Sequence, residues 1–243
     1  MIEKEASIGI YIPSYKRADT ILTHNTVEYY KVVVRQSEYD DYLRTIPAEN
    51  LIAVEDEKIN SVPRVWNWCI DNAKEDIVVM IGDDCPDFIY RLDTNTKIKD
   101  KETITAEIER IGQLMLDLDI GWGCDDPTVV PWGYDGEFAF KGLSGGINWI
   151  NKKVFKSRFN EDVGYCCDTD VVLQELLVNR IVLKPRYFCA GEPKEGSADK
   201  NKGGNSKKSR ASMIASYELM KSKWGKYFDY DLKSNKIFVR VDR

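Results

Sequence analysis

The chain has 243 residues and a formal net charge of −5, which bounds it to one large domain or a domain with a small appendage. Apolar residues make up 43% of it and aromatic residues 11%, enough for a sizeable core, so global disorder is excluded. No stretch approaches the ~20 apolar residues of a membrane span, and the N-terminus lacks the apolar region of a signal peptide. We therefore expect a soluble, cytoplasmic protein without a membrane partner. The six cysteines include no C-x-x-C pair, which favours reduced, buried thiols over disulfides or a zinc site.

Charge is unevenly distributed along the chain. Residues 1–183 carry 20 basic and 33 acidic side chains, a net −13, whereas residues 184–243 carry 15 basic and 7 acidic side chains, a net +8. The overall acidity argues against indiscriminate binding of nucleic acids, but the basic C-terminal quarter can meet phosphates locally. A solvated, lysine-rich surface is the alternative interpretation.

The first ninety residues alternate between strand and helix patterns. Short apolar runs rich in β-branched residues predict strands, and apolar positions at helical spacing predict helices. The expected strands span residues 8–12, 31–35, 51–54 and 77–81, and the expected helices span residues 37–43 and 62–73. This alternation predicts a mostly parallel sheet with right-handed crossovers.

An acidic turn follows the strand at residues 77–81. The strand stops at Gly82, and Asp83, Asp84 and Asp87 come within the next five positions. Closely spaced carboxylates repel each other and are easiest to keep ionised beside a divalent cation. Ligands of open α/β sheets bind at the carboxyl ends of the strands. The pattern therefore favours a Mg²⁺ or Mn²⁺ site for a diphosphate, and the alternative is a solvated turn that caps a helix.

The remainder of the chain is more irregular. The elements expected there are a surface loop at 93–102, helices at 104–118, 171–177 and 211–224, strands at 138–140, 181–183 and 236–241, and a long loop at 191–210. Residues 120–140 are expected to form substrate-facing loops. We expect residues 1–190 to form the main domain, with residues 191–243 packed on it as a basic loop, helix and strand.

Three segments occur in a recognisable order. They are Ile12 to Arg17 at the end of the first strand, the helix–strand–acid segment from Arg64 to Asp84, and Gly145-Gly146 followed by Asp168-Thr169-Asp170. This order resembles the nucleotide-sugar glycosyltransferases of the GT-A fold. The resemblance implies a Rossmann-related α/β fold, with a mostly parallel central sheet flanked by helices and a small C-terminal appendage. It also implies metal-dependent transfer of a sugar from a nucleotide-diphosphate sugar of the UDP-glucose type to a hydroxyl.

A narrower resemblance concerns the acceptor. The tryptophan-rich middle and the Gly203-Gly204-Asn205 segment before a Tyr-Glu-Leu helix are similar to the phage-type TET-associated glycosyltransferases. This likeness implies 5-hydroxymethylcytosine in double-stranded phage DNA as the acceptor and, for a phage-encoded enzyme, the host cytoplasm as its location.

The resemblance and the side-chain chemistry together predict the site residues. Donor binding is assigned to Pro13, Ser14, Tyr15, Lys16, Arg17, Asp56, Arg64 and Asp83. Asp84 is the expected direct ligand of Mn²⁺ or Mg²⁺, with Asp83 beside it. Asp168 or Asp170 is the expected base that deprotonates the acceptor hydroxyl, and either acid can instead be a helix cap. Acceptor contacts are assigned to Gly145, Gly146, Trp149, Lys207, Lys208 and Arg210.

The sequence also departs from the family pattern. Cys85 stands where a third acid is usual, Trp66 stands where an arginine is expected, and no late histidine is present as a metal ligand. These departures leave two alternatives: a sugar-phosphate nucleotidyltransferase, or a non-catalytic binding module with the same fold. The absence of a Gly-rich phosphate loop after the first strand argues against the nucleotidyltransferase.

Overall fold

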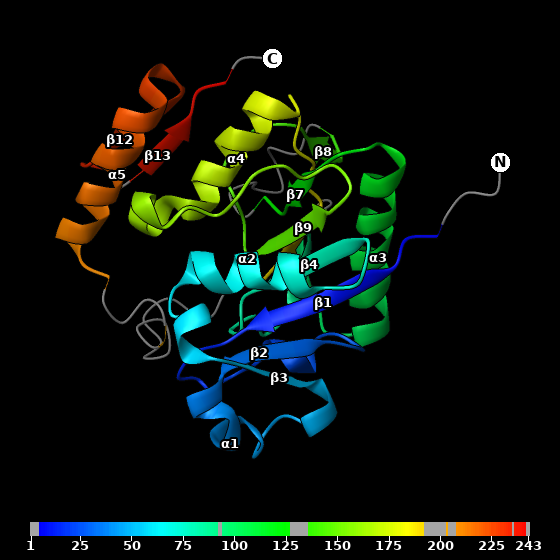
Figure 1. Cartoon of the computed structure of the whole chain (residues 1–243). Helices are drawn as coiled ribbons and strands as arrows, with labels where there is room; N and C mark the ends of the chain where they lie inside the picture. The colour runs from blue at the N-terminus through cyan, green and yellow to red at the C-terminus, as the bar shows by residue number, and fades with distance from the viewer. Residues whose placement is uncertain are drawn as a thin grey trace.

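A computed structural model describes residues 5–91, 94–126, 136–191, 203, 208–234 and 236–241. In this part of the chain, a six-stranded sheet forms the centre of the molecule, in the order β3-β2-β1-β4-β9-β7 (Figure 1). Its strands are β1 (Ile8–Pro13), β2 (Lys31–Arg35), β3 (Leu51–Val54), β4 (Ile77–Ile81), β7 (Trp122–Cys124) and β9 (Ile147–Asn151). Only β9 runs against the others, because β1 to β4 pair in parallel and β9 pairs antiparallel with both β4 and β7. The predicted α/β fold with a mostly parallel sheet is therefore confirmed.

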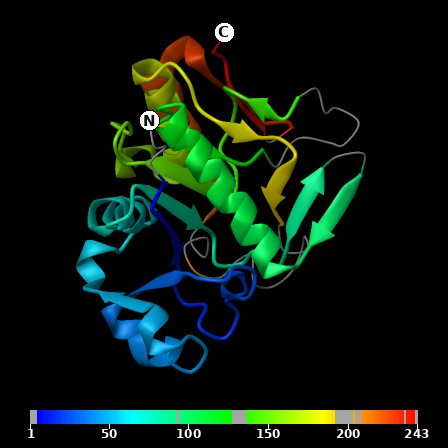
Figure 2. The same cartoon turned by 90° about the vertical axis from the view of Figure 1, so that its right-hand side faces the viewer.

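The central strand β4 is buried on both faces. Val78 and Met80 pack with the helix α2 (Val62–Asn72), whereas Ile77, Val79 and Ile81 pack with the helix α3 (Lys101–Asp117). Figure 2 shows α3 as the green helix that crosses one face of the sheet. This double burial explains why β4 reads as a continuous apolar run rather than an alternating one.

Both flanking helices begin at residues that favour helix starts. The Ser61 side chain accepts a hydrogen bond from the Arg64 backbone, and Pro63 occupies the first turn of α2. Asp100 caps α3 by accepting from the Thr103 backbone. The predicted helices at 62–73 and 104–118 are confirmed, with the second starting three residues earlier.

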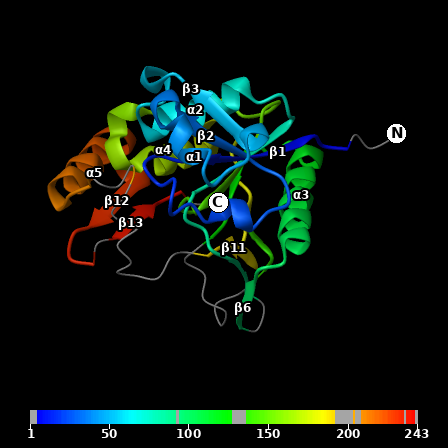
Figure 3. The same ribbon diagram turned by 90° about the horizontal axis from the view of Figure 1, so that it is seen from below.

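A smaller sheet replaces the surface loop that was predicted at residues 93–102. Strands β5 (Phe88–Arg91) and β6 (Asn95–Ile98) pair antiparallel, and β11 (Phe188–Ala190) pairs with the other edge of β5 (Figure 3). The hairpin is stable because its few apolar side chains are buried: Phe88 stacks on Phe188 at 5.1 Å between ring centroids. The polar residues of β6 face solvent, and they account for the loop-like composition.

The C-terminal segment packs on the same body. The helix α5 (Arg210–Trp224) and the hairpin of β12 (Phe228–Asp231) and β13 (Lys236–Val239) lie beside α4 (Cys167–Val178) in Figure 1. Tyr217, Met220 and Phe228 join one apolar cluster with Val171 and Val172 of α4. Remaining elements are α1 (Tyr39–Tyr42), β8 (Phe138–Ala139) and β10 (Lys184–Pro185). Within the described ranges, no helix combines the length and the apolarity that crossing a membrane requires.

Candidate active site

The carboxyl edge of the parallel strands gathers most of the predicted site residues. β1 ends at Pro13, and the turn from Ser14 to Arg17 follows; β4 ends one residue before Gly82 and the acid pair. Since β1 and β4 are parallel neighbours, the two turns meet at one edge of the sheet. The helix α2 runs back across the sheet, so its first turn lies at the same edge (Figure 1).

Asp83 and Asp84 are held by the turn that follows β1. Arg17 Nη1 donates to Asp83 Oδ1 and to Asp84 Oδ2, both at 2.7 Å, and Ser14 Oγ donates to Asp83 Oδ2 at 2.6 Å. The Leu22 backbone N–H also donates to the Asp83 carbonyl at 2.9 Å. Asp83 is buried, whereas 33% of the Asp84 side chain is exposed. Asp83 is thus the inner member of the pair, and Asp84 faces the solvent side where a ligand arrives.

Burial raises the pKa of Asp83, and the charge of Arg17 and the hydrogen bond from Ser14 oppose this rise. A nearby cation favours the charged form of closely spaced carboxylates. Across the described residues, no group of three or more His, Cys, Asp or Glu side chains could hold a metal, so the pair would need ligands from a donor or from water.

A second group of side chains lies where β2 and β3 end. The Arg35 guanidinium packs 3.9 Å from the centre of the Tyr15 ring, and Lys16 Nζ lies 5.2 Å from the same ring. Asp56 accepts hydrogen bonds from the Ser37 backbone at 3.0 Å and from Ser37 Oγ at 2.5 Å, which lower its pKa. A flat ring, a guanidinium and a carboxylate are the groups that recognise a nucleobase.

Arg35 and Ser37 were not among the predicted site residues. Arg35 is the last residue of β2 and Ser37 comes two residues later, so inspection of every strand end finds them.

Gly203 lies against the turn that follows β1. Its φ of 66° is in the left-handed region, and a Cβ at this position would lie 2.7 Å from the Tyr15 carbonyl oxygen and 3.3 Å from Arg17 Nε. Only glycine permits this approach. Gly203, which belongs to the glycine- and lysine-rich segment, therefore lies close to Tyr15 and Arg17, and Arg17 holds the acid pair.

The start of α2 is tied to the segment that precedes α4. Arg64 Nε donates to Glu161 Oε1 at 2.6 Å, and Ser61 Oγ also donates to that carboxylate. Glu161 begins η6 (Glu161–Cys166), which leads directly into α4. Arg64 is thus paired with Glu161 at the surface, and its predicted role in donor binding stays a prediction. The pair brings the start of α4 to the carboxyl edge.

Asp168 and Asp170 have different environments, although they are two residues apart. Asp168 is half-buried, accepts from the Thr169 backbone at 2.7 Å, and has a pKa raised by burial. Asp170 is fully buried and accepts from Gln174 Nε2, Lys223 Nζ and Trp224 Nε1, each at 2.7 Å. Asp170 therefore connects α4 to α5, which is inconsistent with its predicted alternative use as the base. Asp168 is the acid of the two that is free to accept a proton.

The Gly145-Gly146 turn lies next to the acid pair. The Gly82 backbone N–H donates to the Gly146 carbonyl at 3.4 Å. On the other side, the buried Asp125 carboxylate accepts from the backbones of Ile147 at 3.1 Å and Ala190 at 2.9 Å. A Cβ at Gly145 would lie 1.8 Å from Asp125 Oδ1, so no other residue fits there. The two glycines thus place open backbone beside the acids.

Asp125 is a third residue that sequence reasoning missed. Burial raises its pKa to about 6, opposed by its two backbone hydrogen bonds. It follows β7, a three-residue strand in a segment that was expected to be irregular. The available signal was the Gly-Cys-Asp-Asp run at 123–126, which repeats the pattern of acids after an apolar strand.

The predicted acceptor residues are not all available to an acceptor. Trp149 is completely buried in β9, and its Nε1 donates to the Ile108 carbonyl at 3.0 Å, so the prediction that it contacts an acceptor is wrong. Lys208 and Arg210 are exposed near the start of α5, and Lys208 Nζ lies 5.9 Å from the centre of the Tyr165 ring. Lys208 also lowers the pKa of Asp168, in opposition to the burial that raises it. Lys207 lies outside the described residues.

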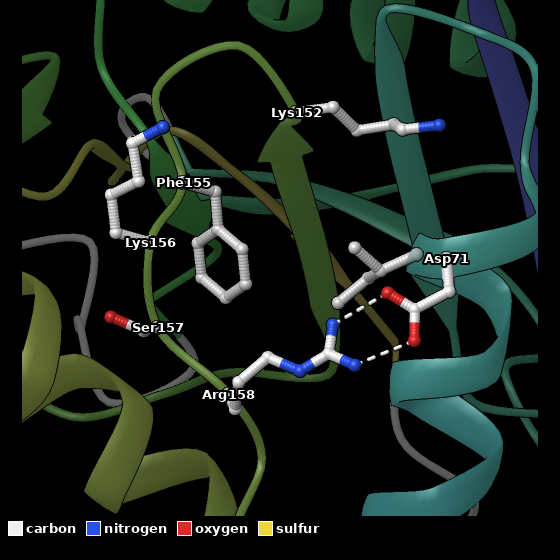
Figure 4. A pocket seen from close by; sticks show the side chains of 7 residues that line it. Asp71, Lys152, Phe155, Lys156, Ser157 and Arg158 are labelled. Carbon is white, nitrogen blue, oxygen red and sulfur yellow. Dashed lines mark hydrogen bonds and ion pairs between the residues drawn. The ribbon is translucent and has the colours of Figure 1, made fainter.

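Two shallow cavities are found on the described surface. One, of about 470 Å³, lies between α2, η6 and the end of α5 and is lined by Arg64, Glu161 and Lys223 among others. The other, of about 410 Å³, lies at the opposite end of α2, where Arg158 forms a bidentate ion pair with Asp71 (Figure 4). Only the first cavity adjoins the carboxyl edge.

Comparisons with known proteins show the family and the fold of the chain. A family model described as TET-associated glycosyltransferase matches residues 8–180. The mannosyltransferase PcManGT from Pyrobaculum calidifontis, in complex with GDP-Man and Mn²⁺, has 16% identity and a TM-score of 0.53, over 79% of this chain and 59% of that chain. Glucosyl-3-phosphoglycerate synthase from M. tuberculosis has 13% identity and a TM-score of 0.51, over 87% of this chain and 80% of that chain. A search of curated proteins found no match. At these identities the structural likeness establishes the GT-A fold.

Proposed function

Because this chain belongs to the TET-associated glycosyltransferase family, we propose that its carboxyl-edge site transfers the sugar of a UDP-glucose-type donor to a hydroxyl with the help of a divalent cation. One observation carries the proposal: the acids after β4 and the turn after β1 converge on one point, where Arg17 meets both carboxylates. The leaving diphosphate needs its charge neutralised at such a point.

The acid pair suits a hard cation. Asp83 Oδ1 and Asp84 Oδ2 both lie 2.7 Å from one nitrogen, so two carboxylate oxygens already point at a common centre. Mg²⁺ is commonly bound by one or two carboxylates together with substrate phosphates and water. A bound Mn²⁺ or Mg²⁺ would supply charge neutralisation of the diphosphate. The PcManGT structure, which contains GDP-Man and Mn²⁺, supports this choice of cofactor.

The other residues bind and orient the reactants. Tyr15, held by Arg35, offers a ring for the nucleobase, and Asp56 retains acceptor capacity for a base N–H beyond its two bonds to Ser37. Gly145 and Gly146 let the acceptor approach the backbone next to the acids. Asp168 accepts the proton from the acceptor hydroxyl, which is otherwise a poor nucleophile.

Replacing Asp84 tests the cation proposal. We expect Asp84→Ala to weaken Mn²⁺-dependent binding of UDP-glucose by about tenfold or more, since the variant loses the solvent-facing carboxylate oxygen. The ligand-free melting temperature should hardly change, because β4 is buried independently of this side chain. Calorimetry measures the UDP-glucose affinity of the variant and of the wild type, each with and without Mn²⁺. GDP-mannose is tested as a competing donor. Equal UDP-glucose affinities in the variant and the wild type would remove Asp84 from the cation site.

We propose 5-hydroxymethylcytosine in double-stranded DNA as the acceptor. Support comes from the family and from the exposed cations Lys208 and Arg210 beside the segment that carries Asp168. Cations at this position can contact a phosphate backbone without reading its sequence. Lys208 and Arg210 would then direct DNA to this side of an otherwise acidic protein.

The double substitution Lys208→Ala, Arg210→Ala tests the acceptor. We expect a higher KM for hydroxymethylated duplex DNA and a salt slope that is shallower by roughly two, since each lost phosphate contact removes about one unit. Transfer to the free hydroxymethyl nucleotide serves as the control and should change much less, because it loses no phosphate-backbone contact and is affected only through the charge of Lys208 near Asp168. If the wild type modifies the duplex and the free nucleotide equally well, without salt dependence, DNA is not the acceptor.

A further inference from the structure

Arg17 occupies the place where a divalent cation would bind the acid pair. It is 6% exposed, and a single nitrogen, Nη1, lies 2.7 Å from an oxygen of each carboxylate. The pair therefore carries its own counter-charge. A guanidinium nitrogen and a metal ion cannot both occupy the centre between these two oxygens, because both are cations and would repel each other at contact distance.

We propose that Arg17 is the resident counter-ion of Asp83 and Asp84, that a divalent cation must displace it, and that a donor diphosphate promotes this exchange by drawing the guanidinium away. This inference rests on the proposed function. A guanidinium is well suited to move between carboxylate and phosphate partners, since its planar array of donors matches both.

The exchange makes the cation and the donor bind cooperatively. Without a donor, the cation must break two charge-assisted hydrogen bonds of Arg17, so its affinity is low. With a diphosphate present, Arg17 has a second anionic partner and releases the carboxylates. Because linkage is reciprocal, the cation must then raise donor affinity by the same factor.

The first measurement is a titration with Mn²⁺ alone at pH 8, followed by the electron paramagnetic resonance signal of the free ion. We expect Arg17→Gln to bind Mn²⁺ about tenfold more tightly than the wild type or more, within the ~5–150-fold range of site couplings. Lys16→Gln is the matched control, because it removes the same charge from the preceding residue, whose Nζ lies over the Tyr15 ring. It should change Mn²⁺ affinity by about twofold or less. Arg17→Lys keeps the charge with a single donor group, and its Mn²⁺ affinity should lie between those of Arg17→Gln and Lys16→Gln.

The second measurement repeats the titrations with UDP, corrected for the Mn²⁺–UDP complex in protein-free buffer. We expect UDP to raise Mn²⁺ affinity more in the wild type than in Arg17→Gln. Equal Mn²⁺ affinities of Arg17→Gln and Lys16→Gln would overturn the displacement, and equal effects of UDP in the wild type and Arg17→Gln would overturn the coupling. If Arg17→Gln does not fold, Arg17→Lys takes its place: its Mn²⁺ affinity is compared with that of Lys16→Gln, and the effect of UDP on it is compared with that in the wild type. The first titration contains no donor, so its outcome does not depend on whether the protein transfers a sugar.

Discussion

Asp168→Asn is expected to reduce turnover by about 10²–10⁴-fold while donor affinity stays unchanged. The variant keeps an oxygen that accepts the Thr169 backbone N–H, but it cannot take a proton from the acceptor hydroxyl. The rate of UDP release with hydroxymethylated duplex DNA as acceptor measures turnover, and calorimetry with UDP-glucose measures donor affinity. A loss of donor affinity that matches the loss of turnover would instead indicate a damaged donor site.

The raised pKa of Asp168 adds an independent readout. Burial favours the neutral acid, so the folded protein binds this proton more readily than the unfolded chain does. The stability contribution of Asp168 is therefore present at low pH and is lost as pH rises through its folded pKa. Above that pH the ionised side chain destabilises the fold, and Asp168→Asn should melt at the same temperature as the wild type or higher. The acid limb of the kcat–pH profile should disappear in the variant.

Asp170→Asn is expected to lose stability rather than turnover, the opposite of Asp168→Asn. The variant loses the charge that pairs with Lys223, whose side chain is 37% exposed, and it places an amide group against the donors of Gln174 and Trp224. Lost charge-assisted hydrogen bonds at a buried acid cost on the order of 2–3 kcal/mol, which corresponds to a fall in melting temperature of about 5–10 °C for a chain of this size. Calorimetric melting of the two Asn variants side by side separates the acids.

A double-mutant cycle with Lys223→Met assigns the effect to the connection between α4 and α5. The penalty of Asp170→Asn should shrink when Lys223 is already absent, because the two residues are in contact. If Asp170→Asn melts like the wild type but loses turnover as strongly as Asp168→Asn, the base assignment to Asp168 alone would be wrong.

The sequence by itself determined the parallel half of the sheet and the place of the acid pair. β1, β2, β3 and β4 are signalled by short apolar runs, and α2 by helical spacing from Val62 to Ala73, all of which are local patterns. Parallel connection then forces the ends of these strands onto one edge. The proximity of the turn after β1 to Asp83 follows from that topology, whereas the pairing of Arg17 with the two acids does not, since Arg17 was assigned to the donor.

The tertiary structure alone decided what the functional side chains contact. Asp168 and Asp170 look alike in sequence, but they lie roughly 200° apart around a helix, so only one of them faces α5. Asp170 accepts hydrogen bonds from Lys223 and Trp224, which come 53 and 54 residues later in the chain. Trp149 was expected at an acceptor because no local pattern shows that β9 is covered on both faces. The short strand β7 forms because β9, further along the chain, pairs with it, and a pattern read along three residues contains no information about that partner.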